Sequence, residues 1–131
     1  MKIIIETIEH FEQRYSTVGD WQFIKGDDDS ETIHIKVSDL GKWQYSMLVG
    51  MHEAIEALLC LGHGVSQADV DSFDIKFEAN RDVDDNSEPG DHPNAPYMEE
   101  HFFATSIERL LAAELGVNWL EYENRIEELG A

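Results

Sequence analysis

The N-terminal part of the chain carries the short alternation of apolar and polar positions that is typical of β-strands. Three segments have this character: residues 2–8, 21–25 and 32–37. In the third segment Ile33, Ile35 and Val37 alternate with polar side chains, which predicts one buried face. The turn-forming residues 26–31 join the second and third segments as a hairpin. The pattern therefore predicts a small antiparallel three-stranded sheet.

From residue 42 onward the apolar positions recur with the period of a helix. Four helices are expected, at about residues 42–61, 67–80, 97–115 and 118–129. Ser38 or Asp39 can cap the first helix, and Ser66 and Asn118 can cap the second and the last. Strands followed by helices, with no internal repeat and no linker, predict a single α+β domain that spans residues 1–131.

Two of the expected helices have an apolar stripe that should face the core. The stripe of the first helix consists of Leu48, Met51, Ile55, Leu58 and Leu59. That of the third helix consists of Phe103, Ile107, Leu110 and Leu111. His52 falls within the first stripe and Glu56 at its edge, one turn further on, whereas His101 and Glu108 lie at one edge of the second stripe. Polar groups are thus expected where these helices meet the core.

The first helix carries the most distinctive chemistry of the chain, His52-Glu53-x-x-Glu56 within an apolar run. Burying a histidine and a carboxylate without partners costs several kcal/mol, on the order of 2–7 for a polar group. Residues four apart on a helix face the same way, so His52 and Glu56 can hold one divalent metal ion. Glu53 would lie beside a water bound to that metal, where it can accept a proton.

A catalytic zinc site uses three protein ligands, so a third residue must come from elsewhere. His101 is the first candidate, because it is a histidine beside the apolar stripe of a later helix. His63 is an alternative, since it follows His52 almost in phase on the helix. Asp74 or Glu78 on the second helix is the remaining alternative. The spacing of the residues leaves these choices open.

A short sheet followed by a helix with His-Glu-x-x-Glu resembles the core of the zincin metalloproteases, whose helix carries His-Glu-x-x-His. The resemblance covers residues 21–63 and implies that His52 is the first metal ligand and Glu53 the general base. At the position of the second zincin histidine this chain has Glu56, which keeps an oxygen ligand. The resemblance implies a hydrolase of the peptidase type that uses zinc or another divalent metal, and it leaves open whether the substrate is a peptide or a small molecule.

The chain also resembles a set of short phage or prophage proteins, through residues 51–60 and 100–114. That resemblance implies no activity, but it places the protein in a bacterial host cell. The sequence has no apolar run of about 18 residues and no signal-peptide pattern, which predicts a cytoplasmic protein. Its single Cys60 excludes an internal disulfide and is expected to be buried.

The net charge is −19, from 28 acidic and 9 basic residues. Nucleic acid and anionic membranes are therefore not expected as partners, because their phosphates would be repelled. The charge and the acidic, proline-rich loop at residues 81–96 are also consistent with a non-enzymatic acidic phage protein that binds a host partner.

A third function is a magnesium-dependent nucleotide pyrophosphohydrolase. Glu53 and Glu56, together with Asp74 or Glu78, resemble the Glu-x-x-Glu…Glu-x-x-Asp layout of that all-helical family. The expected strands are not part of such a fold.

Overall fold

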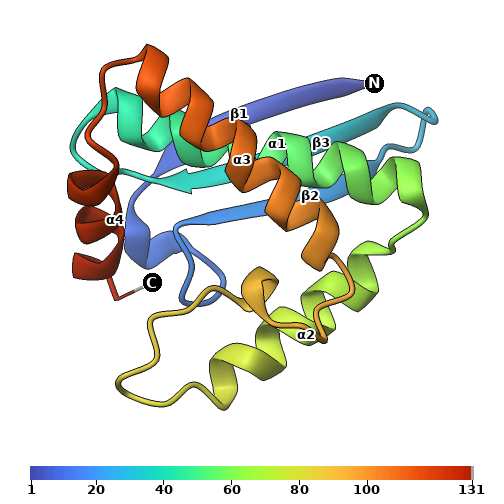
Figure 1. Cartoon of the computed structure of the whole chain (residues 1–131). Helices are drawn as coiled ribbons and strands as arrows, with labels where there is room; N and C mark the ends of the chain where they lie inside the picture. Colours follow the sequence, from blue (N-terminus) through green and yellow to red (C-terminus); the bar gives the residue numbers. More distant parts are fainter. Residues whose placement is uncertain (131) are drawn as a thin grey trace.

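A computed structural model of the chain describes residues 1–130, and it shows a three-stranded sheet followed by four α-helices (Figure 1). The strands are β1 (Lys2–Ile8), β2 (Gly19–Lys25) and β3 (Glu31–Ser38). The helices are α1 (Trp43–His63), α2 (Gln67–Ala79), α3 (Met98–Glu114) and α4 (Trp119–Glu128), with short 3-10 turns at η1 (His10–Glu12) and η2 (Pro89–Asp91). The predicted α+β class is confirmed. None of the helices within residues 1–130 is both long and apolar enough to cross a membrane.

The sheet is mixed, so the prediction of a fully antiparallel sheet was wrong. Its order is β1-β3-β2, with β2 antiparallel to β3 and β1 parallel to β3. The hairpin from β2 to β3 forms as expected. Residues 9–18 carry the chain from one edge of the sheet to the other, so that β3 enters between the first two strands and runs in the direction of β1. The local hairpin signal in the sequence says nothing about this longer connection.

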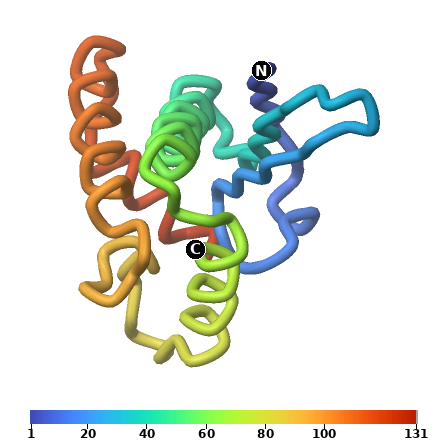
Figure 2. Tube along the Cα trace, turned by 90° about the vertical axis from the view of Figure 1, so that its right-hand side faces the viewer, coloured from blue at the N-terminus to red at the C-terminus, as the bar shows by residue number. Residues whose placement is uncertain are grey.

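Helix α1 forms the middle layer of the molecule. Figure 2 shows it between the sheet on one side and α3 on the other. On the sheet side it covers Ile33, Ile35 and Val37, which are at most 1% exposed and confirm the predicted buried face of β3. The approach is close, because a Cβ atom at Gly50 would lie 2.8 Å from Cγ2 of Ile5. A helix in this position has to bury two faces instead of one.

The two predicted apolar stripes therefore do not simply face the core. Met51 and Leu58 of α1 are 39% and 44% exposed, and Phe103 and Leu110 of α3 are 52% and 65% exposed. Leu48 of the first stripe is fully buried, as predicted. Where the two helices face each other, the buried residues are mostly small or polar: Ala54, Ala57, His52 and Glu56 on α1, and Ala104, Ala112, Glu100, His101 and Glu108 on α3. Small side chains allow the helices to lie close together, and the polar groups meet between them.

The capping predictions have different outcomes. Ser66 and Asn118 cap α2 and α4, where their side chains accept hydrogen bonds from the backbone amides of Asp69 and Glu121. The prediction for α1 was wrong: its N-cap is Lys42, without a side-chain hydrogen bond. Ser38 and Asp39 precede it at the end of β3, and Ser38 is buried there instead.

Candidate metal centre

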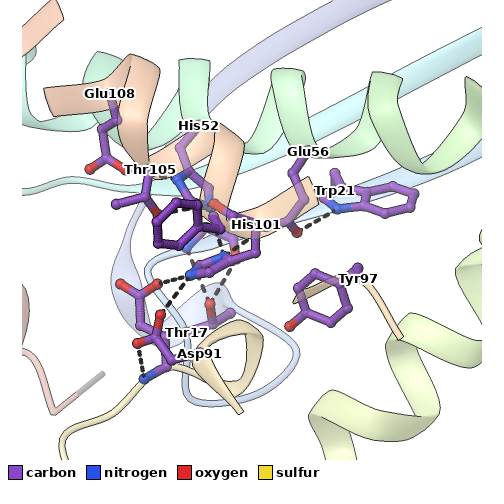
Figure 3. Close-up of polar contacts among 12 residues, drawn as sticks. Thr17, Trp21, His52, Glu56, Asp91, Tyr97, His101, Thr105 and Glu108 are labelled. Carbon is purple, nitrogen blue, oxygen red and sulfur yellow. Dashed lines mark hydrogen bonds and ion pairs between the residues drawn. The ribbon is translucent and has the colours of Figure 1, made fainter. Parts of the chain in front are cut away.

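The two buried faces bring His52 and Glu56 of α1 opposite His101 of α3 (Figure 3). His52 and Glu56 lie one helical turn apart on the same side of α1. All three side chains are buried, with exposed fractions between 4% and 6%. Of the candidates for a third ligand, His101 is thus the one that the structure places beside the pair on α1.

Three potential ligand atoms form a nearly equilateral triangle. Nε2 of His52 lies 3.1 Å from Oε2 of Glu56 and 3.1 Å from Nδ1 of His101. Nδ1 of His101 lies 2.9 Å from the same Glu56 oxygen. Tetrahedral zinc with bonds of about 2.0–2.1 Å separates its ligand atoms by about 3.3 Å. The triangle is within a few tenths of an ångström of that spacing, and its donor set of two imidazoles and one carboxylate is typical of zinc.

The outer nitrogen of His52 is held by a buried carboxylate. Nδ1 of His52 lies 2.7 Å from Oε1 of Glu108 on α3, and Oε2 of Glu108 accepts a hydrogen bond of 2.6 Å from the hydroxyl of Tyr122 on α4. The carboxylate keeps a proton on Nδ1, so loss of the second proton of the imidazole would leave the lone pair of Nε2 directed toward Glu56 and His101. Metal-binding histidines commonly have such an outer partner, which fixes the ring and raises its basicity.

His101 has an analogous arrangement, with acidic partners from the loop before α3. Its Nε2 lies 3.0 Å from a carboxylate oxygen of Glu88 and 3.2 Å from one of Asp91. The distances are those of ion pairs, although neither contact has the direction of a hydrogen bond. Between these two residues Gly90 lies against the imidazole, where a Cβ atom would be 2.3 Å from Cγ of His101. Residues 88–91, which we call the strap, thus pack over the imidazole and limit the movement of Nδ1 of His101 away from Glu56.

Glu56 presents only one oxygen to the histidines. Its other oxygen, Oε1, accepts a hydrogen bond of 3.1 Å from the indole Nε1 of Trp21 on β2. Glu88 forms an alternative ligand set with the same two histidines, with one ligand atom from each residue within 4.8 Å of the others. We favour Glu56, because it is buried and contacts the inward nitrogens, whereas Glu88 is exposed and contacts the outer nitrogen of His101.

The carboxylates around the triangle favour positive charge on its two histidines. Burial alone would lower the pKa of both histidines. Hydrogen bonds to Glu108 and Glu56 for His52, and the close carboxylates of Asp91 and Glu56 for His101, outweigh burial and raise each pKa above the usual value. Burial opposes ionisation of Glu56 too, yet hydrogen bonds from His101 and His52 lower its pKa. In the absence of metal, protons on the two imidazoles supply the charge. A divalent ion would replace them, so metal binding should release protons.

Glu53 differs from the other acidic residues of the site. It lines the same cavity as the triangle, a space of about 90 Å³, and accepts no hydrogen bond from any residue in the 1–130 segment. Burial raises its pKa well above the ordinary value, and the neighbouring charge of Glu56 raises it further. Its side chain packs against Gly19 of β2, where a Cβ atom would be 2.8 Å from Cγ of Glu53. A desolvated carboxylate with a raised pKa is a stronger base than an exposed one.

The alternative third ligands are engaged elsewhere. His63 lies 3.3 Å from Glu100, and its side chain is 58% exposed. Glu78 accepts hydrogen bonds from Nε and Nη2 of Arg81, at 2.9 and 2.8 Å. Asp74 lines the cavity, but its oxygens accept hydrogen bonds from the hydroxyls of Tyr15 and Tyr97.

The sequence interpretation missed the outer partners of the two histidines. The sequence spacing could have identified Glu108 as a partner, since it follows His101 by two helical turns and lies on the same face of α3. No sequence pattern could have identified Glu88 and Asp91, because the position of a loop relative to a helix depends on the tertiary fold.

Asp74 gives the first testable prediction. Burial raises its pKa from 3.8 to about 7, so the folded state holds this proton more tightly than the unfolded state. Stability should then be highest when both states are protonated, and fall as pH rises from about 4 toward 7. We expect Asp74→Asn to gain about 2–3 kcal/mol relative to the unmodified protein between pH 5 and pH 8. Urea unfolding of both proteins at pH 5 and pH 8 measures the difference in their free energies of unfolding. The same difference at both pH values would contradict a raised pKa of Asp74 in the folded state.

Comparisons of the chain with protein-family models, with curated proteins and with solved structures found no significant match.

Proposed function

We propose that this protein is a zinc-dependent hydrolase in which His52, Glu56 and His101 hold the metal and Glu53 is the general base. The observation that carries the proposal is the triangle of inward-facing donor atoms at 2.9–3.1 Å. The outer nitrogen of each imidazole faces carboxylates, which is the arrangement expected around a bound cation. Three protein ligands leave a position for water or substrate, as in catalytic zinc sites.

When bound, zinc would act as a Lewis acid that polarises a substrate carbonyl and makes water more acidic. Glu53 would accept a proton from the attacking water and deliver it to the leaving group. Its raised pKa supports the first transfer, because a carboxylate with a raised pKa is a stronger base than an ordinary one. Hydrolysis of an amide or ester is the reaction that needs these parts, and the resemblance to zincins favours a peptide.

The other two functions have less support. A magnesium site would use oxygen ligands almost exclusively, whereas two of the three triangle residues are histidines. Of the two acids on α2 that this function could use, Glu78 is paired with Arg81. For the acidic binding protein, the loop at 81–96 would be the docking segment, but Glu88 and Asp91 of this loop contact His101, and Ala95 is buried.

Elemental analysis tests the metal site directly. Protein purified after expression in zinc-supplemented medium should contain close to one zinc per chain. His52→Ala and His101→Ala should each contain less than about one tenth of that, because the two ligands that remain in each variant bind the ion too weakly. His63→Ala is the matched control. It removes a histidine from the same helix as His52, and its side chain is exposed.

The outcome can contradict the proposal in two ways. Absence of zinc in the unmodified protein, together with no heat of binding when zinc is titrated into protein treated with a chelator, would exclude the metal site. Equal loss of zinc in His63→Ala and His101→Ala would indicate that the ligand set is different.

A further inference from the structure

The cavity beside the triangle contains a buried carboxyl group that has no role in holding the metal. Asp74 of α2 is 8% exposed and lines the cavity. It accepts hydrogen bonds from the hydroxyls of Tyr15, at 3.1 Å, and of Tyr97. Within residues 1–130 it forms no ion pair with a lysine, arginine or histidine. A buried carboxyl group without a cation is unfavourable, so its presence at a cavity wall needs an explanation.

The remaining charges of the cavity do not compensate for Asp74. Asp20 and Asp71 both bind Arg14, and Glu78 binds Arg81. Five lining carboxyl groups have no lysine or arginine partner among the described residues: Glu53, Glu56, Asp74, Glu88 and Glu108. A divalent ion would add only two positive charges. The cavity therefore keeps a negative potential even with metal bound, and it should repel anions and attract cations.

Aromatic side chains line the same cavity. Tyr15, Trp21 and Tyr97 all line it together with Asp74. Aromatic faces attract cations, most strongly where water is excluded. Each Asp74 oxygen accepts one tyrosine hydroxyl and keeps a further lone pair for an incoming donor. Aromatic walls with a carboxyl group among them suit a compact ammonium group on an alkyl chain.

We propose that Asp74, Tyr15 and Tyr97, in the cavity that Trp21 also lines, bind an alkylammonium group of the substrate, such as the side chain of lysine. The inference rests on the proposed function, because it assigns a substrate class to the same site. The subsite selects a substrate with a cationic group near the bond to be hydrolysed, and it disfavours phosphorylated and acidic substrates. Asp74 acts in specificity, without contact to the reacting atoms.

A binding experiment tests this without any turnover. N-acetyl-lysine methylamide and its neutral analogue N-acetyl-norleucine methylamide are titrated into the zinc-loaded full chain, with binding followed by NMR chemical shifts. We expect the lysine derivative to bind at least about tenfold more tightly, as for a desolvated cation–carboxylate contact. Asp74→Asn should reduce this preference to below about twofold without changing the zinc content, since it removes the charge that the ammonium group contacts. Asp69→Asn, which removes a carboxylate from an exposed position on the same helix, should leave the preference intact.

Each alternative result has a definite meaning. Equal affinity for the two derivatives, or a preference that survives Asp74→Asn, would overturn the subsite. Absence of zinc is measured separately by elemental analysis and would overturn the proposed function. An Asp74-dependent preference in a protein that holds no zinc would support the subsite while rejecting the hydrolase.

Discussion

Replacing Glu53 by glutamine is expected to abolish hydrolysis while leaving the zinc content unchanged. Glutamine keeps the size and shape of the side chain, so the packing against Gly19 persists. It cannot accept a proton from water, and the loss of a general base typically lowers a rate by about 10²–10⁴-fold. The triangle of His52, Glu56 and His101 does not include Glu53, so the metal should remain bound.

The measurement uses a mixed peptide library enriched in lysine, with cleavage followed by mass spectrometry and zinc measured on the same samples. Glu99→Gln is the matched control, because Glu99 is exposed in the first turn of α3 and does not line the cavity. Full activity of Glu53→Gln would reject Glu53 as the base. Loss of both zinc and activity would show that Glu53 holds the metal and would require a different mechanism.

Local patterns were sufficient to predict the elements of this fold. The alternation of Ile33, Ile35 and Val37 predicted the buried face of β3, and each helix ends within two residues of its predicted bounds. These are properties of neighbouring residues, which sequence reasoning captures well. The parallel pairing of β1 with β3 depends instead on where residues 9–18 carry the chain, and no local pattern encodes that path.

The helix faces show a second limit of local reasoning. An apolar stripe predicts the buried side of a helix that packs against one layer. Helix α1 packs between two layers, so Ala54 and Ala57 are buried while Met51 and Leu58 are more than a third exposed. For the same reason the apolar stripe of α3 predicted that Phe103 faces the core, whereas its side chain is exposed.

The candidate site was partly accessible from the sequence for a related reason. His52 and Glu56 share a helix, so their spacing alone predicted that they face the same way. His101 was one of several candidates, and only the antiparallel packing of α1 and α3 distinguishes it from His63. The strap over His101 lies in a segment with no helical or strand periodicity, and its contacts follow from the fold alone.

That strap leads to the second large effect, which is expected from Gly90→Ala. A Cβ atom at residue 90 would lie 2.3 Å from Cγ and 2.6 Å from Nδ1 of His101. The ring cannot retreat freely, because its Nδ1 is already 2.9 Å from Glu56 and 3.1 Å from His52. We expect the free energy of unfolding to fall by about 1–3 kcal/mol through overpacking. Zinc affinity should fall by about 10–100-fold, as when other outer contacts of a metal ligand are lost.

Gly62→Ala is the matched control, because Gly62 lies in α1 and a Cβ atom there would meet nothing within 4 Å. Alanine favours the helix over glycine by about 0.5–1 kcal/mol, so this variant should be slightly more stable and bind zinc normally. Calorimetric zinc titration and urea unfolding of both variants separate the two effects. Normal zinc affinity in Gly90→Ala would mean that the strap moves away from His101 at little cost, and Glu88 and Asp91 would then lose their assigned role in holding its imidazole toward Glu56.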